Sequence, residues 1–332
     1  MIYKNFKDLK LSALGMGAMR LPLKGDDFSD IDQEETEKMV EYAMKQGINY
    51  YDTAWGYHDG RSEVVMGNIL KKYPREKYYL ADKFPGYDLA NMDKVEEIFE
   101  EQLKRCGVDY FDFYLFHNIC ELNIEQYLDE KYGIYDYLIK QKQNGRIRHL
   151  GFSTHGAYEV TKRFLEAYGK DMEFCQVQLN YIDWDFQNAK DQVELLKEYN
   201  IPVWVMEPLR GGKLASIPDE YSKKLQSLRP EETIPAWAFR FLQSIPQVVM
   251  TLSGMSNFQQ MKDNIETFKE ERPLNNAEMD AIFEIAGSMV EKIALPCTEC
   301  RYCVTHCSQE LDIPMLLSLY NEHSFTGGGF LA

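Results

Sequence analysis

Four polar residues stand at or just after the ends of three apolar segments, where they could take part in proton transfer. Asp52 closes the segment INYYD, and Tyr57 follows it in the next loop. Lys83 comes directly after YYLAD, and His117 comes directly after FDFYLF. Taken singly, these residues have ordinary interpretations, such as a helix cap, an exposed charge or a hydrogen-bonded core histidine. Their equivalent places in three consecutive segments favour a shared site.

The chemistry that suits this set is the reduction of a carbonyl group. A free phenol, with a pKa of about 10, is a poor acid near neutrality. A neighbouring ammonium favours the phenolate, so we expect Lys83 to lower the pKa of Tyr57. Tyr57 would then donate a proton to the carbonyl oxygen as hydride reaches its carbon. We expect Asp52 to orient Lys83, and His117 to hydrogen-bond the substrate oxygen.

A second set of reactive side chains is a compact group of cysteines near the end of the chain. The segment LPCTECRYCVTHCSQELDIP has the spacing C-x₂-C-x₂-C-x₃-C, formed by Cys297, Cys300, Cys303 and Cys307. This spacing is typical of ferredoxins, in which such a run wraps the corners of a 4Fe–4S cluster. Zinc sites more often use two separated pairs. We therefore predict a 4Fe–4S cluster, with another metal or a group of unligated thiols as alternatives.

Two features depart from the ferredoxin pattern. Ser308 follows the last cysteine where ferredoxins usually have proline, and no second cysteine run is present. Either Cys307 completes its own cluster or the fourth iron takes another ligand. The cluster could staple a C-terminal cap, or it could exchange electrons with a ferredoxin or flavodoxin-type partner. We expect the remaining cysteines to be buried as small hydrophobic residues: Cys106, Cys120 and Cys175.

The elements that must position these residues alternate regularly along the chain. Eight short apolar segments predict strands buried on both faces, at 13–18, 48–52, 78–82, 111–116, 147–152, 175–180, 202–206 and 248–252. Helical patterns separate them, at 34–46, 91–106, 123–143, 156–168, 187–199, 231–243, 256–269 and 275–291. This alternation predicts an α/β fold, a parallel (β/α)₈ TIM barrel, in preference to an open doubly wound sheet. We expect the barrel in residues 1–285 and a small helical, ferredoxin-like cysteine-rich extension in residues 286–332.

Composition narrows the classes of function. The 332 residues carry 37 basic and 53 acidic side chains, a net charge of −16, so nucleic acid is not expected as a partner. With 45% hydrophobic residues, the chain can bury a large core. We expect no membrane partner, because no apolar run approaches 20 residues. The first residues, MIYKNFKDLK, show no secretory signal, which predicts a cytoplasmic protein.

Three motifs together resemble the aldo-keto reductase family. They are YYDTAWGYHDGRSEVVMGNIL, ADKF and DFYLFHN, and the resemblance runs from about residue 10 to about residue 285. It implies a (β/α)₈ barrel that reduces carbonyl groups with NAD(P)H through an Asp/Tyr/Lys/His tetrad. In this sequence the tetrad is Asp52, Tyr57, Lys83 and His117.

The resemblance also implies positions that contact the cofactor. Ser153 and Gln176 correspond to residues that bind the nicotinamide carboxamide, and Met206 stands where many relatives stack a tyrosine on the ring. The amides of Leu209, Gly211 and Gly212 would approach the pyrophosphate. A segment similar to that of the potassium-channel β-subunit branch would bind the adenosine, through Ser256, Gln260, Asp263, Asn264 and Arg240. Arg240 would favour NADP(H), with NAD(H) as the alternative.

The sequence thus predicts an NADPH-dependent enzyme acting on a small carbonyl or alcohol substrate. Trp55, Phe84 and Trp184 are candidate walls of the substrate site, with core packing as their alternative role. A regulatory cofactor-binding protein with incidental turnover is a second hypothesis. An electron carrier with a vestigial barrel is a third.

Overall fold

The computed structural model describes residues 1–291, 295, 307, 309 and 311–326. They form two compact units. The barrel unit comprises Met1–Leu179, Ala189–Met206 and Ile245–Arg272, and the helical unit comprises Asn180–Asn188, Glu207–Ser244 and Pro273–Ala332. The predicted boundary near residue 285 stays a prediction, and most of the cysteine-rich segment lies outside the described residues.

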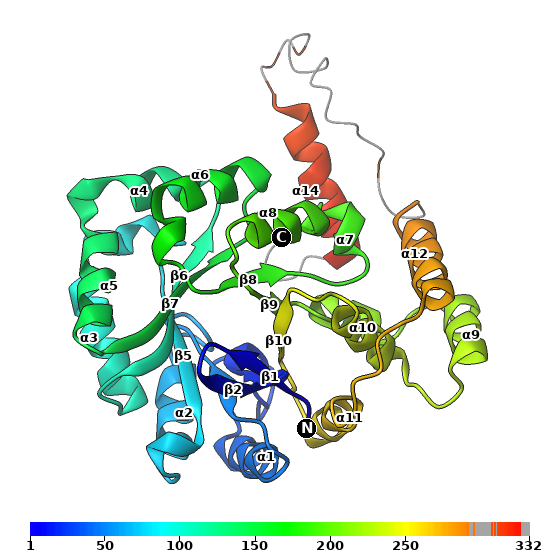
Figure 1. Cartoon of the computed structure of the whole chain (residues 1–332), viewed down its shortest axis with the longest axis horizontal. Coiled ribbons are helices and arrows are strands. Elements are labelled where there is room, and N and C mark those ends of the chain that lie inside the picture. The colour runs from blue at the N-terminus through cyan, green and yellow to red at the C-terminus, as the bar shows by residue number, and fades with distance from the viewer. Residues whose placement is uncertain (292–294, 296–306, 308, 310, 327–332) are drawn as a thin grey trace. The chain divides into compact units, whose positions relative to one another are not determined.

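The barrel unit confirms the predicted (β/α)₈ fold (Figure 1). Its strands form a closed parallel barrel in the order β10-β3-β4-β5-β6-β7-β8-β9. Their bounds are β3 Leu14–Gly17, β4 Tyr50–Asp52, β5 Tyr79–Phe84, β6 Phe111–Ile119, β7 Ile147–Thr154, β8 Cys175–Gln178, β9 Val203–Met206 and β10 Val248–Ser253. All eight predicted strands are present, because each is an apolar run short enough to cross the barrel once.

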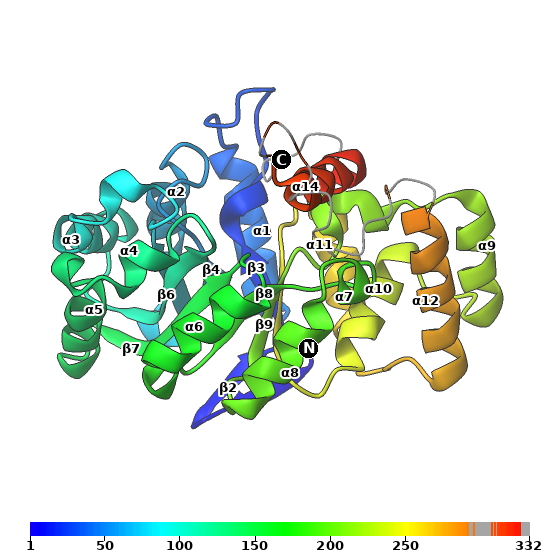
Figure 2. The ribbon, with the colours of Figure 1, turned by 90° about the horizontal axis from the view of Figure 1, so that it is seen from above.

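Helices lie around the outside of the strands (Figures 1 and 2). They are α1 Gln33–Lys45, α2 Ser62–Leu70, α3 Val95–Cys106, α4 Ile124–Leu128, α5 Ile134–Gln143, α6 Tyr158–Tyr168, α8 Ala189–Glu198 and α11 Phe258–Thr267. Their termini carry the expected caps: Asp32 accepts from the N–H of Glu35 at the start of α1, and Gly107 ends α3 with a φ of 65°.

A hairpin that the sequence reading missed precedes the barrel. Strands β1 Tyr3–Phe6 and β2 Leu9–Ser12 pair antiparallel. The Phe6 ring lies 5.0 Å from that of Trp204 and 5.7 Å from that of Phe113, inside a buried cluster drawn from several barrel strands. The hairpin therefore supplies an aromatic side chain to the barrel core.

The helical unit contains α7 Asp183–Phe186, α9 Asp219–Leu228, α10 Ile234–Gln243, α12 Asn276–Glu291 and α14 Ile313–Thr326. Arg229 forms a bidentate ion pair with Glu278, with both N–O distances 2.7 Å, and so ties the end of α9 to α12. A membrane-spanning helix is absent from the part of the chain that the structure describes.

Candidate active site

Parallel strands and one loop bring the four predicted catalytic residues together in the barrel unit. Asp52 ends β4, Lys83 is the fifth residue of β5 and His117 lies in β6. Tyr57 lies in the turn between β4 and α2. That turn is closed by Ser62, whose N–H donates to the Tyr57 carbonyl at 3.2 Å and whose hydroxyl lies 2.8 Å from that of Thr53.

Lys83 is the hub of the site. Its side chain is fully buried, and its ammonium donates to Asp52 Oδ1 at 2.6 Å and to the Thr53 carbonyl at 2.8 Å. The third contact of Nζ is the Tyr57 hydroxyl, at 3.4 Å. The three contacts fix the ammonium between a carboxylate and the phenol, which is the arrangement that the sequence analysis expects.

Burial and charge act on these groups in opposite directions. Burial lowers the pKa of Lys83, but the Asp52 carboxylate and Tyr57 outweigh it, so the net pKa is raised and the lysine is an ammonium. Burial raises the pKa of Tyr57, and Lys83 opposes this effect without cancelling it. The expected lowering by Lys83 is therefore present, but the net direction is upward because desolvation is larger. The phenol is protonated at neutral pH.

His117 lies beside the phenol. The two rings are 6.2 Å apart and nearly perpendicular, at 81°. Burial, with Lys83 as a second cause, holds the pKa of His117 well below its usual value, so the imidazole is neutral. Its Nδ1 atom is buried and has no hydrogen-bond partner among the described residues. The ring can therefore both donate and accept a hydrogen bond at this end of the barrel.

Two neighbours of His117 were missed from the sequence. The Tyr87 ring stands edge-on to His117 at 5.1 Å, and its hydroxyl lies against Gly56, so closely that a Cβ there would clash. Asn118 follows His117 with a φ of 58°, and its N–H donates to Ser153 Oγ at 2.8 Å. Only their positions in the sequence could have indicated these two residues. Asn118 is next to the predicted catalytic residue His117, and Tyr87 comes shortly after a predicted strand.

The predicted carboxamide site lies on β7 and β8. Ser153 and Gln176 are paired in register on these adjacent strands. Gln176 Oε1 and Asn118 Oδ1 are buried and have no partner among the described residues. A carboxamide group offers two N–H donors and one carbonyl acceptor. These suit two acceptor oxygens without partners that lie beside the Ser153 hydroxyl. These residues therefore suit the nicotinamide carboxamide, and Met206 ends the next strand, β9.

The remaining cofactor positions of the barrel unit lie near α11. Gln260 Oε1 accepts from the Ser256 N–H at 2.8 Å, and Asp263 Oδ1 accepts from Gln259 at 2.8 Å. Asn264 is buried and donates to Ser253 Oγ at 3.1 Å. These contacts order the start of the helix, and the adenosine contacts of these residues stay a prediction.

The helical unit holds the other predicted residues. Leu209 precedes a short 3₁₀ turn in which Gly211 and Gly212 have φ values of 64° and 94°. A Cβ at Gly212 would meet no atom within 4 Å among the residues that the structure describes. Arg240 is buried and donates to Glu232 at 3.0 Å, and the Trp184 ring stands edge-on to Phe241 at 5.7 Å. Their roles toward the cofactor and substrate stay predictions.

The other two candidate walls have structural contacts of their own. The Trp55 ring is half-buried and lies 3.8 Å from the Arg105 guanidinium, a cation–π contact. Phe84 is completely buried and packs against Tyr127. Both contacts are those of packing residues, and a role in lining a substrate site stays a prediction for each.

One of the four predicted cluster ligands is among the described residues. Cys297, Cys300 and Cys303 fall outside the described residues. Cys307 is described, and its sulfur accepts from the Leu311 N–H at 3.4 Å. Within the described ranges, no group of three or more His, Cys, Asp or Glu residues could hold a metal. Cys106 and Cys175 are buried, as expected, and Cys120 is half-buried.

Comparisons with known proteins find similar sequences along most of this chain. A profile of the Aldo/keto reductase family matches residues 13–286. The uncharacterized oxidoreductase YqkF of Bacillus subtilis is 24% identical over 305 residues, which are 83% of this chain and 92% of YqkF. The NADH-specific methylglyoxal reductase of Escherichia coli is 29% identical over 224 residues, which are 62% of this chain and 66% of that protein.

Solved structures share the fold. Aldo-keto reductase AKR11C1 from Bacillus halodurans, in its holo form, has a TM-score of 0.70 at 23% identity, covering 86% of this chain and 96% of its own. An aldo/keto reductase from Klebsiella pneumoniae, in complex with NADP and acetate, has a TM-score of 0.66 at 17% identity and covers 85% of this chain and 93% of its own.

Proposed function

Because this chain belongs to the aldo/keto reductase family, we propose that it is an NADPH-dependent carbonyl reductase, with Tyr57 as the proton donor to an aldehyde or ketone. The observation that carries the proposal is the Lys83 ammonium held between Asp52 and the Tyr57 hydroxyl, at 2.6 and 3.4 Å. A solitary buried lysine would lose its charge, whereas this one is kept charged by Asp52. The family is one of oxidoreductases, and the arrangement suits acid catalysis.

Bound NADPH supplies the hydride. The chain supplies the rest of the chemistry. The protonated Tyr57 hydroxyl donates its proton to the carbonyl oxygen, and the adjacent ammonium stabilises the phenolate that remains. The neutral His117 ring is placed to donate a hydrogen bond to the same oxygen and to orient it. In alcohol oxidation the roles reverse, and the Tyr57 phenolate accepts the proton.

The choice of NADPH is the finer part of the proposal. Arg240 supports it, because it stands where the potassium-channel β-subunit branch has an arginine and, with Ser256, could bind a 2′-phosphate; a structural neighbour was solved with NADP. A relative in Escherichia coli is NADH-specific, so NADH is the alternative. Parallel kinetics with both cofactors decide the question, because a phosphate-binding arginine lowers the KM for NADPH alone. We retain the cytoplasmic location, and the absence of nucleic-acid and membrane partners, as predictions.

The test of the enzyme is NADPH oxidation with 4-nitrobenzaldehyde and 9,10-phenanthrenequinone. We expect Tyr57→Phe to lower kcat by about 100-fold or more, the range of general acid catalysis. Cofactor binding, followed by NADPH fluorescence, is the control and should be retained. Equal turnover by both proteins would contradict the role of Tyr57. No turnover by either would favour the second hypothesis, a regulatory cofactor-binding protein.

We propose in addition that Cys297, Cys300, Cys303 and Cys307 hold a 4Fe–4S cluster. The spacing of four thiolates supports it, and the N–H donated to Cys307 by Leu311 is a contact that suits a thiolate. The cluster would stabilise the C-terminal segment or pass electrons to a ferredoxin or flavodoxin-type partner. Iron and sulfide analysis of anaerobically purified protein tests it. About four of each per chain is expected, and loss of iron in Cys300→Ser is the control.

A further inference from the structure

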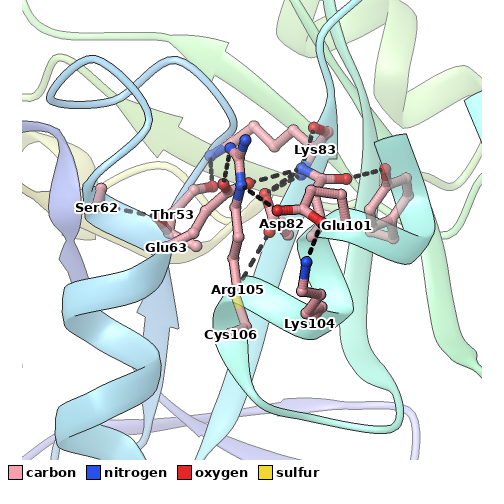
Figure 3. A network of polar contacts seen from close by, with 11 residues as sticks. Thr53, Ser62, Glu63, Asp82, Lys83, Glu101, Lys104, Arg105 and Cys106 are labelled. Atoms are coloured by element: carbon pink, nitrogen blue, oxygen red, sulfur yellow. Dashed lines mark hydrogen bonds and ion pairs between the residues drawn. The ribbon is translucent and has the colours of Figure 1, made fainter. Parts of the chain in front are cut away.

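A second buried polar cluster lies behind Lys83, on the opposite face of strand β5. Successive residues of a strand point to opposite faces, so Asp82 points away from the side that carries the Lys83 ammonium. It meets Glu63 of α2 and Gln102 of α3, and all three side chains are completely buried. Figure 3 shows Glu63, Asp82 and Arg105 gathered beside Lys83.

The two carboxyl groups of this cluster meet at one side-chain amide. Gln102 Nε2 lies 2.8 Å from Asp82 Oδ1 and 3.0 Å from Glu63 Oε1. Two ionised carboxylates held this close to each other in a buried site would repel each other. The arrangement therefore favours one proton on the pair.

The partners of each carboxyl group indicate where that proton lies. Glu63 Oε2 accepts from Arg105 at 2.9 Å, which compensates a negative charge on Glu63. Asp82 Oδ1 accepts from the Lys83 N–H at 2.8 Å, whereas the Lys83 ammonium is bound to Asp52. Burial raises the pKa of Asp82 well above its usual value, and the Glu63 charge raises it further. The proton therefore belongs on Asp82.

We propose that Asp82 is a neutral carboxylic acid that donates a hydrogen bond to the Glu63 carboxylate, and that this pair positions the catalytic lysine and the tyrosine loop. For its effect on catalysis the proposal rests on the proposed reductase function. Asp82 is a positioning residue, since it acts through Lys83. The placement of its proton is independent of any reaction.

The contacts show how the pair acts on the active site. Asp82 accepts from the backbone N–H of Lys83, and Gln102 donates to the Lys83 carbonyl at 3.0 Å. Glu63 lies in the first turn of α2, directly after the serine that closes the Tyr57 turn. Its partner Arg105 stacks on Trp55, which lies between Asp52 and Tyr57. The cluster thus holds both the backbone of Lys83 and the loop that carries Tyr57.

A neutral Asp82 also leaves no unpaired buried charge. The Lys83–Asp52 and Arg105–Glu63 ion pairs are complete. An ionised Asp82 would add a third negative charge to a buried cluster with two cations, at high cost. The titratable groups that face Asp82 are Asp52, Tyr57, Glu63, Lys83, Cys106 and Tyr114. The Cys106 thiol lies against the second oxygen of Asp82, with Sγ 3.7 Å from Oδ2.

The first test locates the proton without requiring turnover. Infrared spectra are recorded at pH 7 on the full-length wild-type protein, with ¹³C in the side-chain carboxyl group of either aspartate or glutamate, and on unlabelled Asp82→Asn. We expect the carbonyl band of a protonated carboxylic acid to shift with the aspartate label, to stay in place with the glutamate label, and to be lost in Asp82→Asn. A shift of that band with the glutamate label alone would overturn the proposal, as would spectra without any such band. Inactivity of the wild-type protein would not affect this result.

The second test measures positioning. Asn reproduces a neutral Asp, because its oxygen accepts from Lys83 and its amide donates to Glu63. We expect Asp82→Ala to lower kcat by about tenfold with KM within about threefold, and Asp82→Asn to restore kcat to within about threefold of wild type. The pH profile of kcat in Asp82→Asn should superimpose on that of wild type. Equal impairment of both variants would overturn the proposal.

Discussion

At the scale of single residues, the chemistry of this site depends on a balance at Tyr57. Burial raises the pKa of the phenol, which keeps its proton available for donation at neutral pH. Lys83 opposes that effect, and its influence is largest once the phenolate has formed. Tyr57 is an effective proton donor only if the phenolate that remains is stabilised. The 3.4 Å contact between Lys83 Nζ and the Tyr57 hydroxyl therefore matters more after proton transfer than before it.

Removing the lysine charge should therefore change the pH dependence. We expect Lys83→Met to lower kcat for reduction by about 100-fold. Without Lys83 the pKa of Tyr57 rises further, so in alcohol oxidation the rise in rate should move to higher pH. The measurement is the pH profile of kcat for both directions. The double variant Asp52→Asn/Lys83→Met is the control, because it removes both buried charges. A wild-type profile in Lys83→Met would refute the assigned role.

Some residues of this site can be predicted from the sequence because strand order places them, whereas others depend on how the helices pack. Asp52, Lys83 and His117 could be predicted because strand ends converge in any parallel barrel. Asp82 could not, because an aspartate next to a lysine is usually exposed, and only the packing of α2 and α3 buries it. The net direction of the Tyr57 pKa was also beyond the sequence, since desolvation depends on the surrounding atoms.

At the scale of elements, α2 and α3 cross closely at one glycine. A Cβ on Gly67 would lie 2.5 Å from the carbonyl oxygen of Cys106, a backbone atom that cannot rotate away. This glycine is the last residue of SEVVMG, an SE-x-x-x-G motif inside the first of the three segments that resemble the family. The motif begins with Ser62 and Glu63, which support the site. Within six residues, the motif thus contains the serine that closes the Tyr57 turn, the buried carboxylate of Glu63 and the glycine at which α2 and α3 cross.

An added methyl group at this crossing should be costly. We expect Gly67→Ala to lower the free energy of unfolding by about 2 kcal/mol through overpacking. Gly287 in α12 is the matched control, because a Cβ there meets no atom of the described residues within 4 Å. Gly287→Ala should be neutral or stabilising by up to about 1 kcal/mol. Urea unfolding curves measure both, and equal midpoints for the two variants would contradict the close crossing.

Glu173 joins several elements through one carboxylate. It pairs with Lys7 in the hairpin turn, with Lys142 of α5 and with His149 of β7, the last at 2.7 Å. Burial alone would raise the pKa of Glu173, but these partners lower it from 4.5 to about 2. A carboxyl group with a depressed pKa stabilises the fold fully above its unfolded pKa. That stability is lost as pH falls from 4.5 toward 2.

The loss of stability caused by replacing the Glu173 carboxylate should depend on pH over the same range. We expect Glu173→Gln to lower the free energy of unfolding by about 2 kcal/mol at pH 7, a value reduced for the exposure of Lys7. The difference from wild type should shrink as the pH is lowered from 4.5 toward 2. Urea unfolding at several pH values measures it. Glu125→Gln, which breaks an exposed pair with Arg163, is the control and should leave stability unchanged. A difference independent of pH would contradict this assignment.

The elements themselves were largely predictable because burial on both faces gives each barrel strand an apolar run. Helices α2, α7, α9 and α14 lie outside the predicted helical ranges. Two further departures have local causes. The predicted helix at 123–143 is divided into α4 and α5, and Gly133, with a φ of 60°, starts α5. The hairpin was missed because its strands, YKNF and LKLS, are short and half polar. The burial of Phe6 and Leu11 in the barrel core shows why the chain folds there.

At the scale of the whole molecule, the net charge of −16 affects stability through repulsion among many side chains and not through any single contact. Like charges repel one another less in an expanded chain, so this excess of carboxylates lowers the stability of the folded state. Exposed ion pairs, such as Lys45–Glu41, act in the opposite direction and each contributes little. The long-range repulsion and the local pairs respond differently to salt, which makes their balance measurable.

Salt should therefore stabilise this protein at neutral pH. Raising NaCl from about 10 mM to about 150 mM shortens the Debye length from about 30 Å to about 8 Å, which screens distant carboxylates more than pairs in contact. We expect Tm at pH 7 to rise with NaCl over this range. Near the acidic isoelectric point, where the net charge vanishes, the same salt should change Tm little or lower it slightly. A falling Tm at pH 7 would mean that the surface ion pairs outweigh the self-repulsion of the folded chain.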